Sequence, residues 1–235
     1  MKPRVAVVTF PGSNDDRDAL RAVRLFGGEA IPVWHGESDL HGAEAVLLPG
    51  GFSYGDYLRT GAIARFAPVM DAVRDHAASG RPVLGVCNGF QILCEAGLLP
   101  GALIRNRNLA FICRRVNVRV ETSRTPFTSG IEVGEVLEVP IKHGEGQFVA
   151  GPETLARIGD EGLVVFRYCS PRGEITEDAN PNGSTENIAG LRNEHGNVVG
   201  LMPHPEHAVD PDVGPVGGQP LFESLLSSVL ATASS

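Results

Sequence analysis

The chain has 235 residues, of which 42% are hydrophobic and 20% charged, and its formal net charge at pH 7 is −8. This length and balance suit one globular domain whose core needs neither disulfides nor a structural metal. The negative charge argues against nucleic acid or an anionic membrane as a partner, and no apolar run approaches the ~20 residues that span a bilayer.

Short apolar runs alternate with helical patterns through the first hundred residues. The runs typical of buried strands are residues 5–8, 31–34, 45–48 and 82–86. A polar cluster at residues 13–16 supplies helix N-cap side chains, an apolar stripe at residues 63–77 predicts a helix, and another helix begins near Phe90. Strands alternating with helices at this spacing predict a doubly wound, mostly parallel α/β sheet.

The pattern changes between about residues 112 and 149. Val116, Val118 and Val120 alternate with polar residues, and no helical segment separates them from the next apolar run. This alternation predicts a small antiparallel insertion with one face in water. Strand character returns at residues 163–168, 188–191 and 198–202, and a closing helix is predicted at residues 221–229. Because no linker or internal repeat interrupts the chain, we expect a single domain over residues 1–235.

Ligands of open α/β sheets bind beyond the carboxyl ends of the strands. The strand ends at Pro49, Cys87 and Pro203 are therefore the places where a site is expected.

Residues 85–91, GVCNGFQ, combine a strand end, a cysteine and a helix start. Gly85 and Gly89 flank Cys87 in the G-x-nucleophile-x-G spacing of a nucleophile elbow. At such a turn the thiolate would gain from the helix N-terminus, and the N–H of Asn88 could stabilise an oxyanion. The alternative is an ordinary tight turn around a buried cysteine.

The sequence PHPE at residues 203–206 offers a base for this cysteine. Two prolines fix the backbone around His204, and Glu206 can orient its ring. A loop histidine or a partial metal site that includes His207 is the alternative. The metal interpretation lacks a third and fourth ligand at recognisable spacing, so we expect no metal.

The N-terminus leads directly into a strand without a signal-peptide pattern, so we expect a cytoplasmic protein with reduced cysteines. No C-x-x-C pair occurs, and Cys94, Cys113 and Cys169 are expected to be packing residues.

With GVCNGFQ and PHPE established, the chain resembles class I glutamine amidotransferases, which implies a flavodoxin-like doubly wound fold. The resemblance implies Cys87 as nucleophile, His204 as general base and acid, and Glu206 as the residue that orients it. It also implies that Gln91 contacts the glutamine substrate and that the backbone N–H groups of Gly51 and Phe52 complete the oxyanion hole.

Further stretches resemble the glutaminase subunits of phosphoribosylformylglycinamidine synthase, an enzyme of purine biosynthesis. They are FPGSNDDRD (10–18), GGFSYGDYLRTGAIA (50–64), RNRNLAFICRRV (105–116), IKHGEGQF (141–148) and NPNGSTENIAGL (180–191). The resemblance runs from Val5 to His207, and one departure is His207 itself, where the family commonly has arginine.

The resemblance implies that glutamine is hydrolysed to glutamate and ammonia. The ammonia would pass to a synthase subunit that converts formylglycinamide ribonucleotide to formylglycinamidine ribonucleotide with ATP. It allows a small accessory subunit as a further partner. This chain has no P-loop, so no cofactor is expected in it, and ATP and magnesium are expected on the synthase. We expect residues 54–59 and 143–147 to face that partner or the ammonia exit.

Two rival interpretations remain at this stage. A stand-alone cysteine hydrolase or chaperone of the intracellular protease-like family shares the elbow, although a histidine typically follows its cysteine where Asn88 stands here. A non-enzymatic regulatory module would not need the set of Cys87, His204 and Glu206.

Overall fold

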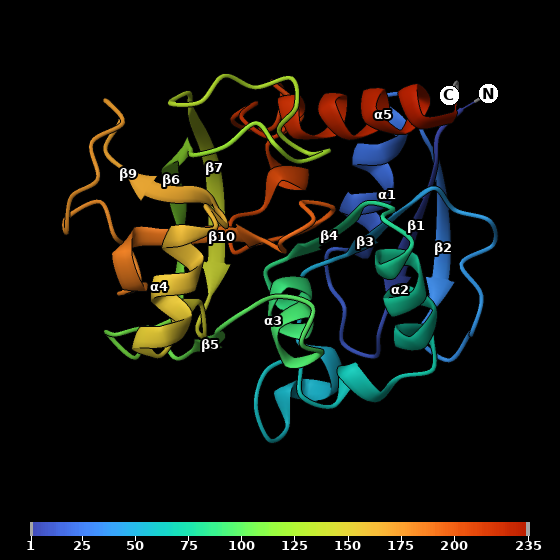
Figure 1. The fold of residues 1–235 in the computed structure, drawn as a ribbon, viewed down its shortest axis with the longest axis horizontal. Helices are drawn as coiled ribbons and strands as arrows, with labels where there is room; N and C mark the ends of the chain where they lie inside the picture. Colours follow the sequence, from blue (N-terminus) through green and yellow to red (C-terminus); the bar gives the residue numbers. More distant parts are fainter. Residues whose placement is uncertain (1, 234–235) are drawn as a thin grey trace.

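The computed structural model describes residues 2–233, which are organised around a nine-stranded sheet (Figure 1). The strand order is β2-β1-β3-β4-β11-β10-β9-β6-β7, and β5 and β8 pair separately. The strands are β1 (Arg4–Thr9), β2 (Glu29–Trp34), β3 (Ala45–Leu48), β4 (Val83–Val86), β5 (Ala102–Ile104), β6 (Ile112–Val120), β7 (Val136–His143), β8 (Gln147–Val149), β9 (Val164–Cys169), β10 (Ile188–Arg192) and β11 (Val198–Leu201). The helices are α1 (Asp16–Leu25), α2 (Val69–Ala78), α3 (Asn88–Glu95), α4 (Pro152–Asp160) and α5 (Gln219–Ala233).

The first five strands of this order are parallel and form the doubly wound half of the molecule. Every residue of β3, β4 and β11 is buried, which explains why these strands are continuous apolar runs. Helices α2 and α3 cover one face, and α1 and α5 cover the other (Figure 1), where Phe26 stacks on Phe222 with ring centroids 6.0 Å apart. The predicted fold class is confirmed.

The remaining four strands continue the same sheet in antiparallel pairing. The hairpin of β6 and β7 is the predicted insertion, and its buried valines at 116, 118 and 120 alternate with half-buried neighbours. The antiparallel part is thus larger than the insertion alone, because β9 and β10 belong to it. It curls so that edge strand β7 returns to the loop after β11, where the N–H of His204 donates to the carbonyl of Pro140 (2.8 Å).

The helix predicted at residues 63–77 is shorter than expected. A single turn at Ala64–Phe66 precedes Pro68, and α2 begins only at Val69. Proline lacks the N–H and restricts its predecessor, so the helix cannot run through it. As a consequence Phe66, which the apolar stripe placed in the core, is 73% exposed. Strands β5 and β8 and helix α4 were not predicted.

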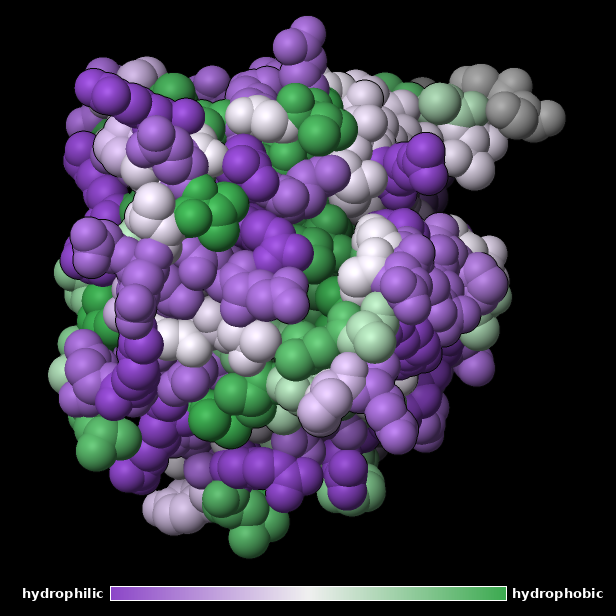
Figure 2. Space-filling view, turned by 60° about the vertical axis from the view of Figure 1, so that its left-hand side comes forward, coloured by the Kyte–Doolittle hydropathy of each residue, from purple (hydrophilic) through white to green (hydrophobic). Residues whose placement is uncertain are grey.

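A face at the antiparallel end of the molecule is largely hydrophilic, with apolar residues in small separate groups (Figure 2). Nearly all of the buried hydrophobic residues form one cluster that includes strands of both halves of the sheet. Within residues 2–233, no helix has the length and apolar character that crossing a membrane requires.

Candidate active site

The three strand ends singled out in the sequence lie side by side. Strands β3, β4 and β11 are consecutive in the sheet and parallel, so their carboxyl ends share one edge. The loop from Pro49, the turn at Cys87 and the PHPE segment leave from that edge. The N–H of Cys87 donates to the carbonyl of Leu201 (2.8 Å), which ties the turn to the end of β11.

Cys87 occupies a strained elbow. Its φ of 49° and ψ of −104° are unusual for a residue with a side chain, and such strain is typical of functional sites. A Cβ on Gly85 would lie 2.5 Å from a Leu93 methyl group, and a Cβ on Gly89 would lie 2.0 Å from the carbonyl oxygen of Leu48. Only glycine fits on either side of the cysteine, as the motif predicts.

His204 is held in one orientation by Glu206. Its Nδ1 lies 2.6 Å from Glu206 Oε1, which leaves Nε2 available to the thiol. The imidazole is completely buried. Burial disfavours the charged ring, but Glu206 and then Cys87 outweigh this effect and raise the pKa of His204 to about 10. The structure therefore favours an imidazolium beside the sulfur, the arrangement that stabilises a thiolate.

The predicted oxyanion donors are only partly available. The N–H of Phe52 donates to the carbonyl of Gly12 (2.8 Å), so it is already engaged. The N–H of Gly51 makes no backbone hydrogen bond among the described residues. Asn88 is the first residue of α3, where the N–H groups of a helix lack intrahelical partners. The expectation for Phe52 is corrected, and donation by Gly51 and Asn88 stays a prediction.

Gln91 lies in the pocket, but its amide is occupied within the protein. Its Oε1 accepts from Asn88 Nδ2 (2.9 Å), and its Nε2 donates to the carbonyl of Glu145. Asn88 Oδ1 in turn accepts from the N–H of Ser53 (3.1 Å). Gln91 therefore braces the pocket wall in this structure, whereas the resemblance implied direct contact with substrate.

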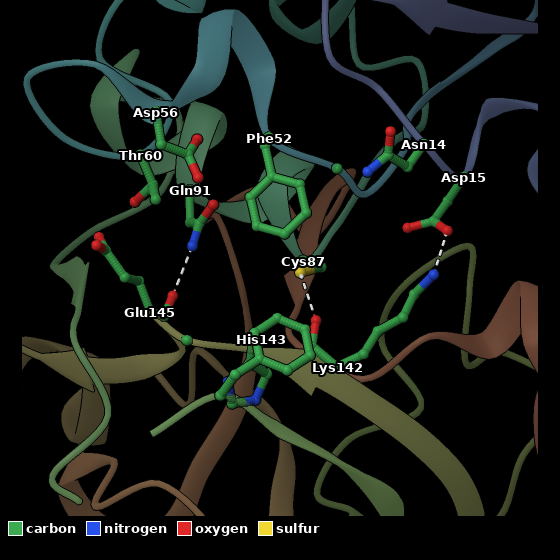
Figure 3. Close-up of a pocket in the computed structure, with 13 residues that line it drawn as sticks. Asn14, Asp15, Phe52, Asp56, Thr60, Cys87, Gln91, Lys142, His143 and Glu145 are labelled. Carbon is green, nitrogen blue, oxygen red and sulfur yellow. Dashed lines mark hydrogen bonds and ion pairs between the residues drawn. The ribbon is translucent and has the colours of Figure 1, made fainter. Parts of the chain in front are cut away.

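A pocket of about 320 Å³ opens above Cys87, a volume suited to a small ligand. Cys87 is central among the residues that line it (Figure 3). Phe52 lies beside Cys87, Asp56, Gln91 and Glu145 lie on one side, and Asp15 and Lys142 lie on the other. His204 is not among the residues that line the pocket.

Several lining residues were missed or misplaced by sequence reasoning. Lys142 and His143 end β7, and the Lys142 carbonyl lies 3.9 Å from Cys87 Sγ. Residues 143–147 were expected to face a partner or the ammonia exit, and His143, Gly144 and Glu145 of this segment line the pocket. His143 is buried, with its Nδ1 3.1 Å from Asn106 Oδ1. The motif at residues 141–148 was noticed, but only the curl of the sheet shows that it borders the nucleophile.

The polar cluster at residues 13–16 was expected to supply the N-cap of α1. Asp15 occupies the N-cap position but makes no side-chain cap hydrogen bond to the described residues of the helix. Its carboxylate points instead toward Lys142 Nζ and His207 Nε2, the latter 3.1 Å away.

Ligand atoms of Asp15, His204, Glu206 and His207 all lie within 4.8 Å of one another. The sequence argument against a metal was that a third and a fourth ligand are lacking at recognisable spacing, and Asp15 adds a carboxylate from a distant part of the chain. These atoms are nevertheless engaged with each other, and the Lys142 ammonium already contacts the Asp15 carboxylate. We interpret the group as an ion-pair network, and the absence of a metal stays a prediction.

The other cysteines are all free, and they differ in exposure. Cys169 is buried, and burial raises the pKa of the Cys94 thiol. Cys113 is exposed, so the expectation that it packs in the core is wrong.

Comparison with known proteins gives a consistent result. Residues 2–217 match the family described as CobB/CobQ-like glutamine amidotransferase domain. The phosphoribosylformylglycinamidine synthase subunit PurQ of Thermomicrobium roseum is 58% identical over 233 residues, 99% of each chain. PurQ of Acaryochloris marina is 55% identical over 229 residues, 97% of each chain.

A solved structure of PurLQS from Thermotoga maritima aligns with a TM-score of 0.85 and 44% identity, covering 97% of this chain and 99% of that one. These matches favour an amidotransferase over an intracellular protease-like hydrolase. The chain therefore belongs to the glutamine amidotransferase family, in the group formed by the PurQ subunits of phosphoribosylformylglycinamidine synthase.

Proposed function

We propose that this chain hydrolyses glutamine to glutamate and ammonia with Cys87 as nucleophile. The observation that carries the proposal is the elbow at Cys87 beside a buried His204 whose Nδ1 is fixed by Glu206. This is the arrangement of nucleophile, base and orienting carboxylate that acyl transfer requires.

The chemistry follows from these positions. The Cys87 thiolate attacks the side-chain amide carbon of glutamine, and the resulting oxyanion accepts hydrogen bonds from the N–H groups of Gly51 and Asn88. His204 donates a proton to the amide nitrogen, the C–N bond breaks, and ammonia leaves a glutamyl thioester. Water then gives a proton to His204 and attacks the thioester carbon, and glutamate departs as the thiolate re-forms.

The polar groups of the pocket support an amino acid as substrate. Asp56 and Glu145 lie together on one side of Cys87 (Figure 3), where their negative charge would attract an α-ammonium group. Asp56 Oδ1 is buried and has no hydrogen-bond partner among the described residues. Burial and then the neighbouring Glu145 raise the pKa of Asp56 to about 6, as expected for a carboxylate without a counter-charge.

We propose that the ammonia is transferred to a synthase subunit, which uses ATP and magnesium to convert formylglycinamide ribonucleotide to formylglycinamidine ribonucleotide. The similarity to the solved structure of PurLQS from Thermotoga maritima supports such an assembly, and a small accessory subunit is part of the same proposal. Exposed apolar side chains favour a docking surface near the pocket: Tyr57 and Leu58 follow Asp56, and Phe111 lines the pocket and is 57% exposed.

The remaining expectations belong to the same proposal. A single amidotransferase domain over residues 1–235 is supported by a core cluster that runs from Val5 to Val229. A cytoplasmic location, which keeps the thiols reduced, is consistent with the four free cysteines. No cofactor is proposed for this chain.

The test is glutamate release from glutamine by the purified chain, alone and with the synthase subunit, for wild type and Cys87→Ala. We expect release with wild type and none with Cys87→Ala. Cys113→Ala is the matched control, because that cysteine is exposed and is not among the residues that line the pocket. Equal release by wild type and Cys87→Ala in the complex would refute the proposal.

A further inference from the structure

A second carboxylate lies against the catalytic imidazole. Asp15 Oδ2 is 3.6 Å from His204 Nδ1, the same nitrogen that lies 2.6 Å from Glu206 Oε1. Asp15 is 2% exposed although it is ionisable. Gly50 packs against both groups, since a Cβ there would lie 2.4 Å from Asp15 Oδ2 and 2.7 Å from His204 Cε1. No water layer therefore separates the carboxylate from the ring.

The charge of Asp15 is balanced from two other elements. Lys142 reaches it from the end of β7, and His207 reaches it from the segment after His204. Burial opposes ionisation of Asp15, but His207, His204 and Lys142 together lower its pKa well below the usual range. A buried carboxylate with this much compensation is ionised throughout the working pH range.

Lys142 connects this carboxylate to the nucleophile. Its ammonium contacts Asp15, while its backbone carbonyl is the oxygen 3.9 Å from Cys87 Sγ. Lys142 of β7 thus contacts both the Asp15 carboxylate, through its ammonium, and the sulfur of Cys87, through its backbone carbonyl. The start of α1, the end of β7 and the segment after β11 therefore meet around a single imidazole.

We propose that Asp15 is a positioning residue for His204, a second carboxylate that acts beside Glu206 and is tuned by Lys142 and His207. The inference rests on the proposed function of His204 as general base and acid. Two carboxylates on one nitrogen hold the ring in the orientation that directs Nε2 at the thiol. Asp15 also favours the imidazolium, whereas Lys142 weakens that effect because it offsets part of the negative charge.

The groups that face the imidazole are few, so the electrostatic signs can be worked out. Glu206, Asp15 and the Cys87 thiolate favour the charged ring. Lys142 and a protonated His207, whose ring centroid is 5.4 Å from that of His204, oppose it. His143, buried and interacting with His204, has its pKa lowered to about 4 by burial first and by His204 second, so it is neutral at pH 7.

The experiment is the pH dependence of Cys87 alkylation by iodoacetamide, followed by mass spectrometry of its peptide, in wild type, Asp15→Asn and Lys142→Met. Removing the negative charge of Asp15 disfavours the imidazolium and favours the negatively charged sulfur, so Asp15→Asn moves the alkylation profile to lower pH. Lys142→Met removes a positive charge and moves it to higher pH. The basic limb of kcat/KM for glutamine hydrolysis is expected to shift in the same two directions.

Shifts of opposite sign in the two variants support the proposal. A midpoint unchanged in both variants, or displaced in the same direction in both, overturns it. An Asp15→Asn variant that loses kcat with an unshifted profile also overturns it, because that is the signature of a purely structural role. If Asp15→Asn does not fold, Lys142→Met still tests the proposal. The Lys142 side chain is one-third exposed, so its replacement should leave the fold intact, and a shift of the alkylation profile to lower pH would overturn the proposal. Alkylation requires no glutaminase activity, so failure of the proposed function would show separately as absent glutamate release by wild type.

Discussion

Gly89 offers a direct test of how the elbow is built. It is the second residue of α3, and a Cβ there would lie 2.0 Å from the carbonyl oxygen and 2.7 Å from the carbonyl carbon of Leu48. These are backbone atoms of β3, so no side-chain rotation can relieve the contact. Alanine stabilises a helix by up to about 1 kcal/mol relative to glycine. At residue 89 the contact with the Leu48 backbone opposes this gain.

Overpacking of a core typically costs about 1–3 kcal/mol, and a backbone contact this short lies at the upper end. We therefore expect Gly89→Ala to destabilise the fold by about 2 kcal/mol after the helical gain is subtracted. Gly159→Ala in α4 is the matched control. A Cβ at Gly159 would meet nothing within 4 Å, so this variant should be stabilised by up to about 1 kcal/mol.

The assay is urea unfolding followed by circular dichroism, together with glutamine hydrolysis. With a slope of about 2 kcal/mol/M, Gly89→Ala should lower the unfolding midpoint by roughly 1 M. Its hydrolysis should fall in parallel, because α3 can move away from β3 only by displacing Cys87. If Gly89→Ala unfolds at the wild-type midpoint while Gly159→Ala behaves as expected, the steric account of the elbow is wrong.

Three further predictions concern ionisable groups. Asp56→Asn should raise KM for glutamine about tenfold with little change in kcat, which corresponds to a loss of roughly 1.4 kcal/mol of ammonium binding. Because the pKa of Asp56 is about 6, the wild-type KM should rise below that pH. A wild-type KM that stays constant between pH 5 and 8 would count against the assignment. Glu206→Gln removes the carboxylate that contributes most to raising the pKa of His204. The basic limb of kcat/KM should therefore move to lower pH, and kcat should fall by about 100-fold or more. A pH profile that is not shifted in steady-state assays would contradict this prediction. Burial, aided by Arg81, lowers the pKa of His76 to about 4, so between about pH 6.5 and 4 the unfolded chain binds a proton that the folded chain does not, and stability falls as the pH falls. His76→Leu should reduce this pH-dependent loss of unfolding free energy by about 2 kcal/mol. The measurement is urea unfolding of wild type and variant at pH 7 and 4.5, and an equal loss of stability in the two proteins would contradict the prediction.

The elements that the sequence predicted well are those in which local pattern and burial agree. The parallel strands β1, β3 and β4 are buried on both faces, so their apolar runs are unambiguous. The helix at residues 63–77 failed where Pro68 interrupts a convincing apolar stripe. Helix α4 was missed because Ile158 is its one buried residue among those described, which leaves little apolar periodicity.

The amino-acid sequence by itself determined the nucleophile turn and the His204–Glu206 pair, because each is encoded within a few residues. Gly85 and Gly89 define the elbow through steric exclusion, and a separation of two residues brings Glu206 to the ring of His204. The tertiary structure alone decided which other groups meet there. Asp15 follows β1 and Lys142 ends β7, and no spacing rule joins them.

The physical reason is the curl of the antiparallel strands. Pairing along β10, β9 and β6 carries the edge strand β7 back to the PHPE segment, where Pro140 accepts the His204 N–H. Local propensity specifies each of these strands separately, but the path of the sheet depends on the packing of all of them together. That path places a lysine ammonium beside a buried carboxylate, and it thereby sets the charge balance around the imidazole of His204.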